Sequence, residues 1–150
     1  ILATITIVSF GAIQNRAHDS AVQSDLRQVG LRIQNYYHEK NDTLPVAAAG
    51  NFNGVESGGL KLSTGSYGAH YNNGSNNYNM LYCQNPTSKQ FALVAGSKSG
   101  AMYSYKDGKV SPTTAFGSGA STCTTHGVSG AAVFWIYGQG GTNAWATWAL

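Results

Sequence analysis

The first 37 residues form one unbroken pattern, in which an apolar run passes directly into a polar stretch that keeps a helical period. Residues 1–13, ILATITIVSFGAI, contain no charge and no proline. At a rise of about 1.5 Å per residue, this run covers roughly 20 Å as a helix, which is less than the roughly 30 Å of a bilayer core. We therefore expect the tail end of a longer apolar helix rather than a complete membrane span.

Residues 14–40 continue the helix with a single apolar stripe. The members of the stripe are Val22, Leu26, Val29, Ile33 and Tyr36. Their steps of four, three, four and three place them on one face of a helix, which we expect to pack on a globular head. Asn41, Asp42 and Pro45 mark the end, since proline disfavours helical geometry in the residue before it. A helix of about 40 residues is roughly 60 Å long, so it must protrude from a head of this size.

A signal peptide and a buried core helix are the alternatives for residues 1–13. A signal peptide needs a basic start and a cleavage site of small residues. Here the basic start is absent, and the helical pattern continues past any such site. A buried core helix would normally alternate apolar and polar faces and carry its own caps. We therefore expect an exposed assembly or membrane helix.

The stretch ILATITIVSFGAIQNRAHDSAVQSDLRQVGLRIQNYY resembles the second half of the N-terminal helix of type IV pilins and the related type II secretion pseudopilins. In that family a prepilin peptidase removes a leader, and the helix begins with a methylated residue and an early glutamate. The resemblance therefore starts in mid-helix and implies a native N-terminus upstream of Ile1. Val8 stands where many members have a helix-kinking proline, so Gly11 is the nearest weak point for local melting of the helix in a filament.

The resemblance implies an α+β fold, in which a long protruding helix packs on an antiparallel sheet. Residues 1–40 would form the helix, with an apolar assembly part at 1–13 and an amphipathic part at 14–40. Residues 41–150 would form a β-rich head with long loops rich in Gly, Asn and Ser. The side chains expected to drive assembly are Ile1, Leu2, Ile5, Ile7, Val8, Phe10 and Ile13.

The composition favours a secreted or surface-displayed domain. Only 10% of the 150 residues are charged, against roughly 25% in typical soluble domains, and 19 are glycine. A net charge of +3 with scattered lysines does not favour a nucleic-acid partner, which requires clustered Lys and Arg. Cys83 and Cys123 form an even pair that favours one disulfide, with two buried thiols as the alternative. A metal role for Cys123 with His126 would have too few ligands.

Apolar runs predict strands at 80–83, 90–95 and 101–105. Residues 96–100 predict a hairpin between the last two, and residues 106–109 predict a tight turn into a short strand at Val110. A further run at 131–137 is expected to be the most buried strand of the C-terminal half. Residues 46–80 and 111–130 are expected to be surface loops, the first with a short strand around Leu60 and Leu62. The expected anchors of the first loop are Tyr67, Tyr71 and Tyr78.

Several surface features have more than one interpretation. Trp145 and Trp148 either close the core or form a contact surface for a neighbouring subunit or a sugar. Asn41 and Asn73 begin N-glycosylation patterns, and the 111–129 loop is equally able to carry O-linked sugar.

The chain lacks the residue patterns that an enzyme needs. It has six carboxylates and four scattered histidines, and it contains no phosphate-binding Gly-Lys-Ser or Gly-Lys-Thr. Asp19 and Asp25 lie six positions apart on the predicted helix and so point in different directions. We expect no catalytic activity, no cofactor and no metal.

The leading hypothesis is therefore a structural subunit of an extracellular type IV pilus, which the resemblance connects with adhesion, twitching motility or DNA uptake. The expected partners are further copies in a helical homopolymer, the cytoplasmic membrane before assembly, the pilus assembly machinery and a host-cell or surface ligand. One alternative is a pseudopilin of a type II secretion or competence system. A second is a membrane-tethered domain that binds glycans through Tyr71, Trp145 and Trp148.

Overall fold

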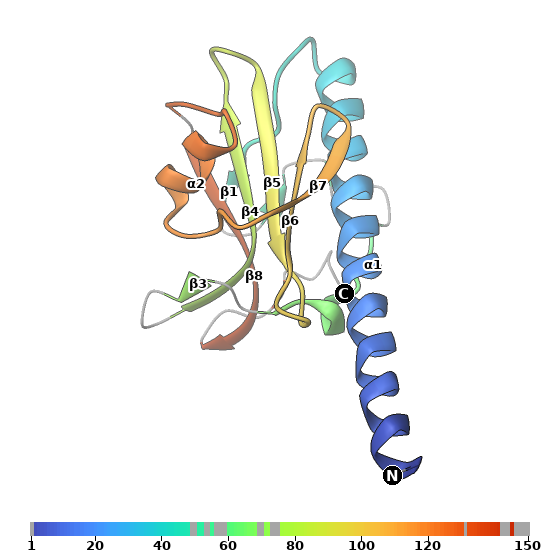
Figure 1. The fold of residues 1–150 in the computed structure, drawn as a ribbon. Coiled ribbons are helices and arrows are strands. Elements are labelled where there is room, and N and C mark those ends of the chain that lie inside the picture. The colour runs from blue at the N-terminus through green and yellow to red at the C-terminus, as the bar shows by residue number, and fades with distance from the viewer. Residues whose placement is uncertain are drawn as a thin grey trace.

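The computed structural model describes residues 2–48, 51–52, 55, 60–68, 71–72, 76–130, 132–141 and 145. Its longest element is helix α1 (Leu2–Glu39), which lies along one face of an antiparallel sheet and extends well beyond the end of that sheet (Figure 1). With 38 residues, the helix is about 57 Å long. The predicted helix is confirmed over these residues, and it is unbroken at Gly11.

The end of α1 lies where the sequence predicts it. The backbone N–H groups of Lys40 and Asp42 donate to the carbonyls of Tyr36 and Tyr37, at 2.9 and 3.0 Å. Asn41 and Asp42 then adopt φ angles of 50° and 60°. Asparagine and aspartate tolerate this left-handed region better than most residues, so the chain leaves the helix here at little cost.

The head contains a small and a large antiparallel sheet. The small sheet pairs β1 (Ala47–Ala48) with β2 (Asn51–Phe52). The large sheet has the order β3-β4-β5-β6-β7, and β8 pairs with β4. Its strands are β3 (Tyr71–Asn72), β4 (Asn76–Asn85), β5 (Gln90–Gly96), β6 (Met102–Lys106), β7 (Lys109–Thr113) and β8 (Ala132–Gly141). The strands predicted at 80–83, 90–95, 101–105, around Val110 and at 131–137 are confirmed, although β4 and β8 are longer than predicted. Both predicted hairpins, β5–β6 and β6–β7, are confirmed as well.

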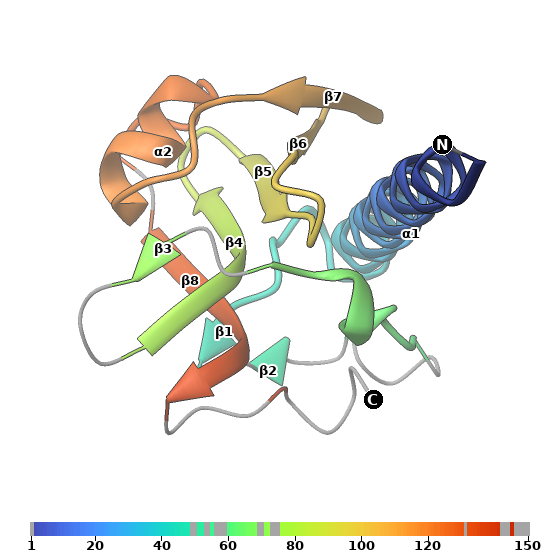
Figure 2. The same ribbon diagram turned by 60° about the horizontal axis from the view of Figure 1, so that its bottom comes forward.

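Both faces of the sheet are covered, which explains why β4 and β5 carry unbroken apolar runs instead of alternating ones. Met80 and Tyr82 pack in the cluster beneath α1, whereas their neighbours Leu81 and Cys83 pack in a second cluster. A short helix, α2 (Gly119–Thr125), contributes Cys123 to this second cluster. Figure 2 shows α1 and α2 on opposite sides of the sheet.

Three predictions about the loops are wrong. The segment 46–80, predicted to be a loop with one short strand, contains β1, β2, β3 and the first residues of β4, because backbone pairing across the sheet outweighs its polar, loop-like composition. The segment 111–130, predicted to be a loop, contains α2, because packing of Thr122 and Cys123 outweighs the weak helix propensity of Ser, Thr and Gly. Residues 60–62 form no strand; Leu60 and Leu62 are buried and Lys61 is exposed, and a 3-10 helix, η2 (Thr64–Ser66), follows. The expectation that residues 131–137 form the most buried strand concerns side chains outside the described set, so it stays a prediction.

Candidate functional site on helix α1

The second half of α1 is fixed to the head by its apolar stripe. The residues Val22, Leu26, Val29 and Ile33 are fully buried, and the half-buried Tyr36 packs against the same cluster. Fully burying an aliphatic side chain contributes about 1.5–3 kcal/mol. The stripe is therefore sufficient to hold this half of the helix on the sheet, as the sequence predicted.

Helix and sheet lie very close together at Gly30. A Cβ placed on Gly30 would overlap the ring of Tyr105 and would lie 2.6 Å from its Cδ1 atom. Tyr105 is itself fully buried, and its ring stacks on Phe91 with centroids 6.0 Å apart. Only glycine allows the backbone of α1 to lie directly on this ring, and sequence reasoning assigned no role to Gly30.

A buried carboxylate provides a polar attachment in the same half of the helix. Asp25 is 3% exposed, and it accepts hydrogen bonds from the Ser63 backbone N–H at 2.7 Å and the Tyr67 hydroxyl at 3.0 Å. The Ser63 hydroxyl also donates to it, at 3.3 Å. Burial raises the pKa of Asp25, and these hydrogen bonds partly offset that rise. Burial and the neighbouring Asp25 charge likewise raise the pKa of Tyr67.

Sequence reasoning placed Asp25 among the polar positions outside the stripe, and its burial was missed. The signal was present in the spacing, because Asp25 lies three residues after Val22 and four before Val29. It therefore lies on the edge of the buried face. Asp19 points to a different head segment, where its carboxylate accepts a hydrogen bond from Ser99 at 2.5 Å.

The helix leaves the head near His18, whose Nδ1 lies 3.2 Å from the hydroxyl oxygen of Ser66. On the N-terminal side of this contact, residues 12–17 are all exposed. Phe10 and Ile13 are 62% and 64% exposed, and their spacing of three places them on one face of the helix. The other predicted assembly residues, Leu2, Ile5, Ile7 and Val8, lie in α1 with side chains outside the described set, and Ile1 lies outside the described residues.

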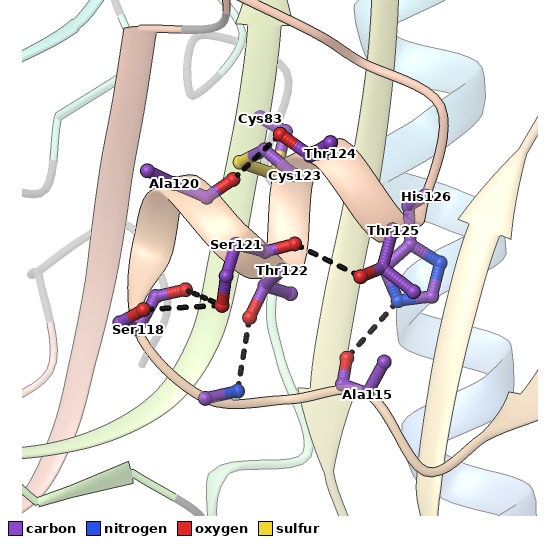
Figure 3. The surroundings of a disulfide bond; sticks show 11 residues. Cys83, Ala115, Ser118, Ala120, Ser121, Thr122, Cys123, Thr124, Thr125 and His126 are labelled. Carbon is purple, nitrogen blue, oxygen red and sulfur yellow. Dashed lines mark hydrogen bonds between the residues drawn. A yellow bond between two sulfur atoms is a disulfide. The ribbon is translucent and has the colours of Figure 1, made fainter.

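The predicted disulfide is confirmed. Cys83 of β4 is bonded to Cys123 of α2, with Cα atoms 5.5 Å apart, as Figure 3 shows. The bond uses Cys123, so this residue is not a metal ligand with His126, whose Nε2 instead lies 3.1 Å from the Ala115 carbonyl oxygen. Within the described ranges, no three His, Cys, Asp or Glu side chains gather into a metal site.

The hydroxyls of α2 are engaged in hydrogen bonds within the helix and with the segment directly before it (Figure 3). Thr124 and Thr125 donate to the carbonyls of Ala120 and Ser121, at 3.1 and 3.0 Å. These hydroxyls lie on an exposed surface. O-linked modification of residues 111–129 stays a prediction.

The remaining predicted surface residues are only partly described. Trp145 is half-buried and makes an edge contact with the fully buried Tyr67 at a centroid distance of 5.0 Å, which favours the core-closing interpretation. Asn41 is exposed, so its glycosylation pattern is accessible. Trp148 and Asn73 lie outside the described residues, and Tyr71 belongs to β3 with its side chain outside the described set.

Comparison with known proteins yielded no relative. A scan against protein-family models found no match, and searches of curated proteins and of solved structures found none either. Within the described part of the chain, no helix is both long and apolar enough to cross a membrane.

Proposed function

We propose that this chain is a structural subunit of a filament of the type IV pilus kind and polymerises through the N-terminal part of α1. One observation carries the proposal: a single continuous helix is firmly packed on the head in its second half and projects with exposed Phe10 and Ile13 in its first half. Large apolar side chains exposed on one face of a helix are a common sign of an interaction surface.

The energetics support assembly through this surface. Burying Phe10 and Ile13 against neighbouring helices would contribute about 1.5–3 kcal/mol for each side chain. Contacts that join a surface of one copy to a different surface of the next generate an open helical polymer when the rotation between copies does not close a ring. The apolar residues 2–9, which precede Phe10 in the same helix, would extend this contact.

The attachment of α1 to the head suits a subunit that bears load. The buried stripe, the Asp25 hydrogen bonds and the close contact at Gly30 all join α1 to the sheet. The disulfide joins the opposite face of that sheet to α2. Force applied along the helix would thus be transmitted to a head whose sheet is held by contacts on both of its faces.

The rest of the proposal concerns cellular context. Before assembly the apolar part of α1 would hold the subunit in the cytoplasmic membrane, and dedicated machinery would build the extracellular filament. The filament would serve adhesion, twitching motility or DNA uptake. The same geometry also suits a pseudopilin of a secretion or competence system, which would form a short rather than a long polymer. Glycan binding through Trp145 is less favoured, because this ring packs on Tyr67.

The test is a charge placed on the projecting face. We expect Phe10→Asp to abolish filaments, because assembly would bury an unpaired carboxylate. The matched control is Ser24→Asp, which adds the same charge at an exposed position of the packed half of α1. Filament yield is measured by electron microscopy of sheared surface material, with circular dichroism to check the fold. Normal filaments from Phe10→Asp would overturn the proposal.

A further inference from the structure

A hollow of about 330 Å³ lies where the end of α1 meets the start of β5. Its lining comes from three separate segments of the chain: the last turns of α1, the stretch after the helix, and the end of the β4–β5 turn with the first residues of β5. The lining side chains are Gln34, Tyr37, His38, Leu44, Lys89 and Phe91. The volume is at the lower end of the range for small-molecule sites, so it suits one ring-sized ligand rather than a nucleotide.

One part of the lining is aromatic and apolar. Phe91 and Tyr37 are half-buried, and Leu44 is buried. The Phe91 ring is held in place by the core, since it stacks on Tyr105 at 6.0 Å and lies tilted to Tyr82 at 6.3 Å. Such fixed rings offer an apolar surface to a ligand at little entropic cost.

The other part of the lining is polar and carries positive charge. The six described lining side chains include one ammonium, one imidazole and one amide, and they include no carboxylate. The Lys89 ammonium lies 3.5 Å from the Asp42 carboxylate, but both side chains are more than half exposed, at 51% and 56%. An ion pair this exposed is weak, so a ligand carboxylate could replace Asp42 as the partner of Lys89.

The backbone of Lys89 adds an independent observation. Its φ angle is 55°, in the left-handed region that glycine or asparagine adopts more cheaply. The turn before it is strongly determined, because the Asn85 side-chain oxygen accepts hydrogen bonds from the N–H groups of Thr87 and Ser88. A strained residue that the surroundings over-determine is a recognised feature of ligand sites. Lysine at this turn position provides an ammonium group, which glycine lacks, at the edge of the hollow.

We propose that this hollow binds a sugar ring that carries a carboxylate, such as a hexuronate unit. The ligand carboxylate pairs with Lys89, the apolar face of the ring lies against Phe91 and Tyr37, and its hydroxyls bond to Gln34 and His38. A fatty or purely aromatic acid fits less well, because half of the lining is polar. The inference concerns the head and the end of α1 that packs on it, and it does not depend on filament assembly.

The test measures binding of a galacturonate trisaccharide to the 150-residue chain by titration and by chemical-shift changes, with a neutral galactose trisaccharide as the ligand control. We expect a Kd on the order of 1 mM for the acidic sugar, with the largest shifts at Tyr37 and Phe91. The neutral sugar should bind about two- to fivefold more weakly, because it lacks the carboxylate that pairs with the exposed Lys89.

Variants of Lys89 distinguish a loss of its charge from a loss of the fold. Lys89→Gln should weaken binding by about two- to fivefold, the size expected for an exposed ion pair, whereas Lys89→Arg retains it. Lys109→Gln, a change at an exposed lysine on β7, should leave binding unchanged. Lys89→Gly should weaken binding likewise and yet unfold at an equal or higher temperature, because glycine adopts this φ freely. Absence of binding, equal affinity for the neutral sugar, or unchanged affinity in Lys89→Gln would each overturn the proposal.

Discussion

Replacement of Gly30 by alanine tests how α1 is attached to the head. In most helices this change stabilises the protein, because alanine has the higher helix propensity by about 1 kcal/mol. Here we expect the opposite result. The new methyl group would occupy the space of the Tyr105 ring, which is fully buried and stacked on Phe91.

The magnitude follows from the spacing. The added Cβ would lie 2.6 Å from Tyr105 Cδ1 and closer still to two other ring atoms, whereas carbon atoms normally pack at about 3.5–4.0 Å. The helix or the ring must therefore move by roughly 1 Å. Overpacking of this kind costs about 3 kcal/mol at the upper end of its usual range. After the gain in propensity, the free energy of unfolding should fall by about 2 kcal/mol, or about 4–8 °C in Tm.

Thermal and urea unfolding of the monomeric chain measure this change. Gly11→Ala is the matched control, since it lies in the same helix and an added Cβ there meets nothing within 4 Å. This control should be as stable as the parent chain or more so. In a Tyr105→Leu background, which removes the ring, Gly30→Ala should cost little. If Gly30→Ala proved as stable as Gly11→Ala, the proposed close packing of α1 on Tyr105 would be refuted.

The remaining predictions concern the disulfide and Asp25. Replacing both Cys83 and Cys123 by serine should lower the free energy of unfolding by about 4 kcal/mol, because the bond closes a loop with a sequence separation of 40. Urea unfolding measures this change, and an unchanged midpoint would contradict the prediction. Asp25→Ala should cost roughly 3 kcal/mol by leaving the Ser63 N–H and the Tyr67 hydroxyl without their acceptor, and Asp25→Asn should cost less because it keeps one. Burial raises the pKa of Asp25, so the native state binds a proton at Asp25 more readily than the unfolded chain does. Protonation of Asp25 therefore stabilises the native state at low pH, and this stabilisation is lost as pH rises through the raised pKa. The stability of Asp25→Asn relative to the parent chain should therefore increase from about pH 4 to about pH 7. A constant or a decreasing difference would contradict the raised pKa of Asp25.

The sequence predicted the parts of the fold that depend on periodicity. The spacing of Val22, Leu26, Val29 and Ile33 identified the face of α1 that packs on the sheet. Apolar runs bounded by turn residues located β4, β5 and β6, because strand pairing there agrees with local propensity. The disulfide followed from the cysteine count and the apparent export of the chain.

Other features depend on tertiary contacts that local patterns do not report. Helix α2 forms in a segment of low helix propensity because Cys123 and Thr122 are packed against the sheet. The role of Gly30 becomes visible only when Tyr105, 75 positions later, is seen to lie on it. The hollow beside Lys89 combines side chains from three chain segments, and no spacing within one segment indicates it.

In the proposed filament, Phe10 and Ile13 lie in contacts between copies of this chain. The most direct test of these contacts is electron cryo-microscopy of fibres sheared from the source cells and shown by mass spectrometry to contain this protein. We expect filaments in which the N-terminal parts of α1 pack together around the axis, with both side chains buried and the heads outside. Fibres joined through the heads, with Phe10 and Ile13 in solvent, or a surface fraction that holds the protein without filaments, would contradict this arrangement.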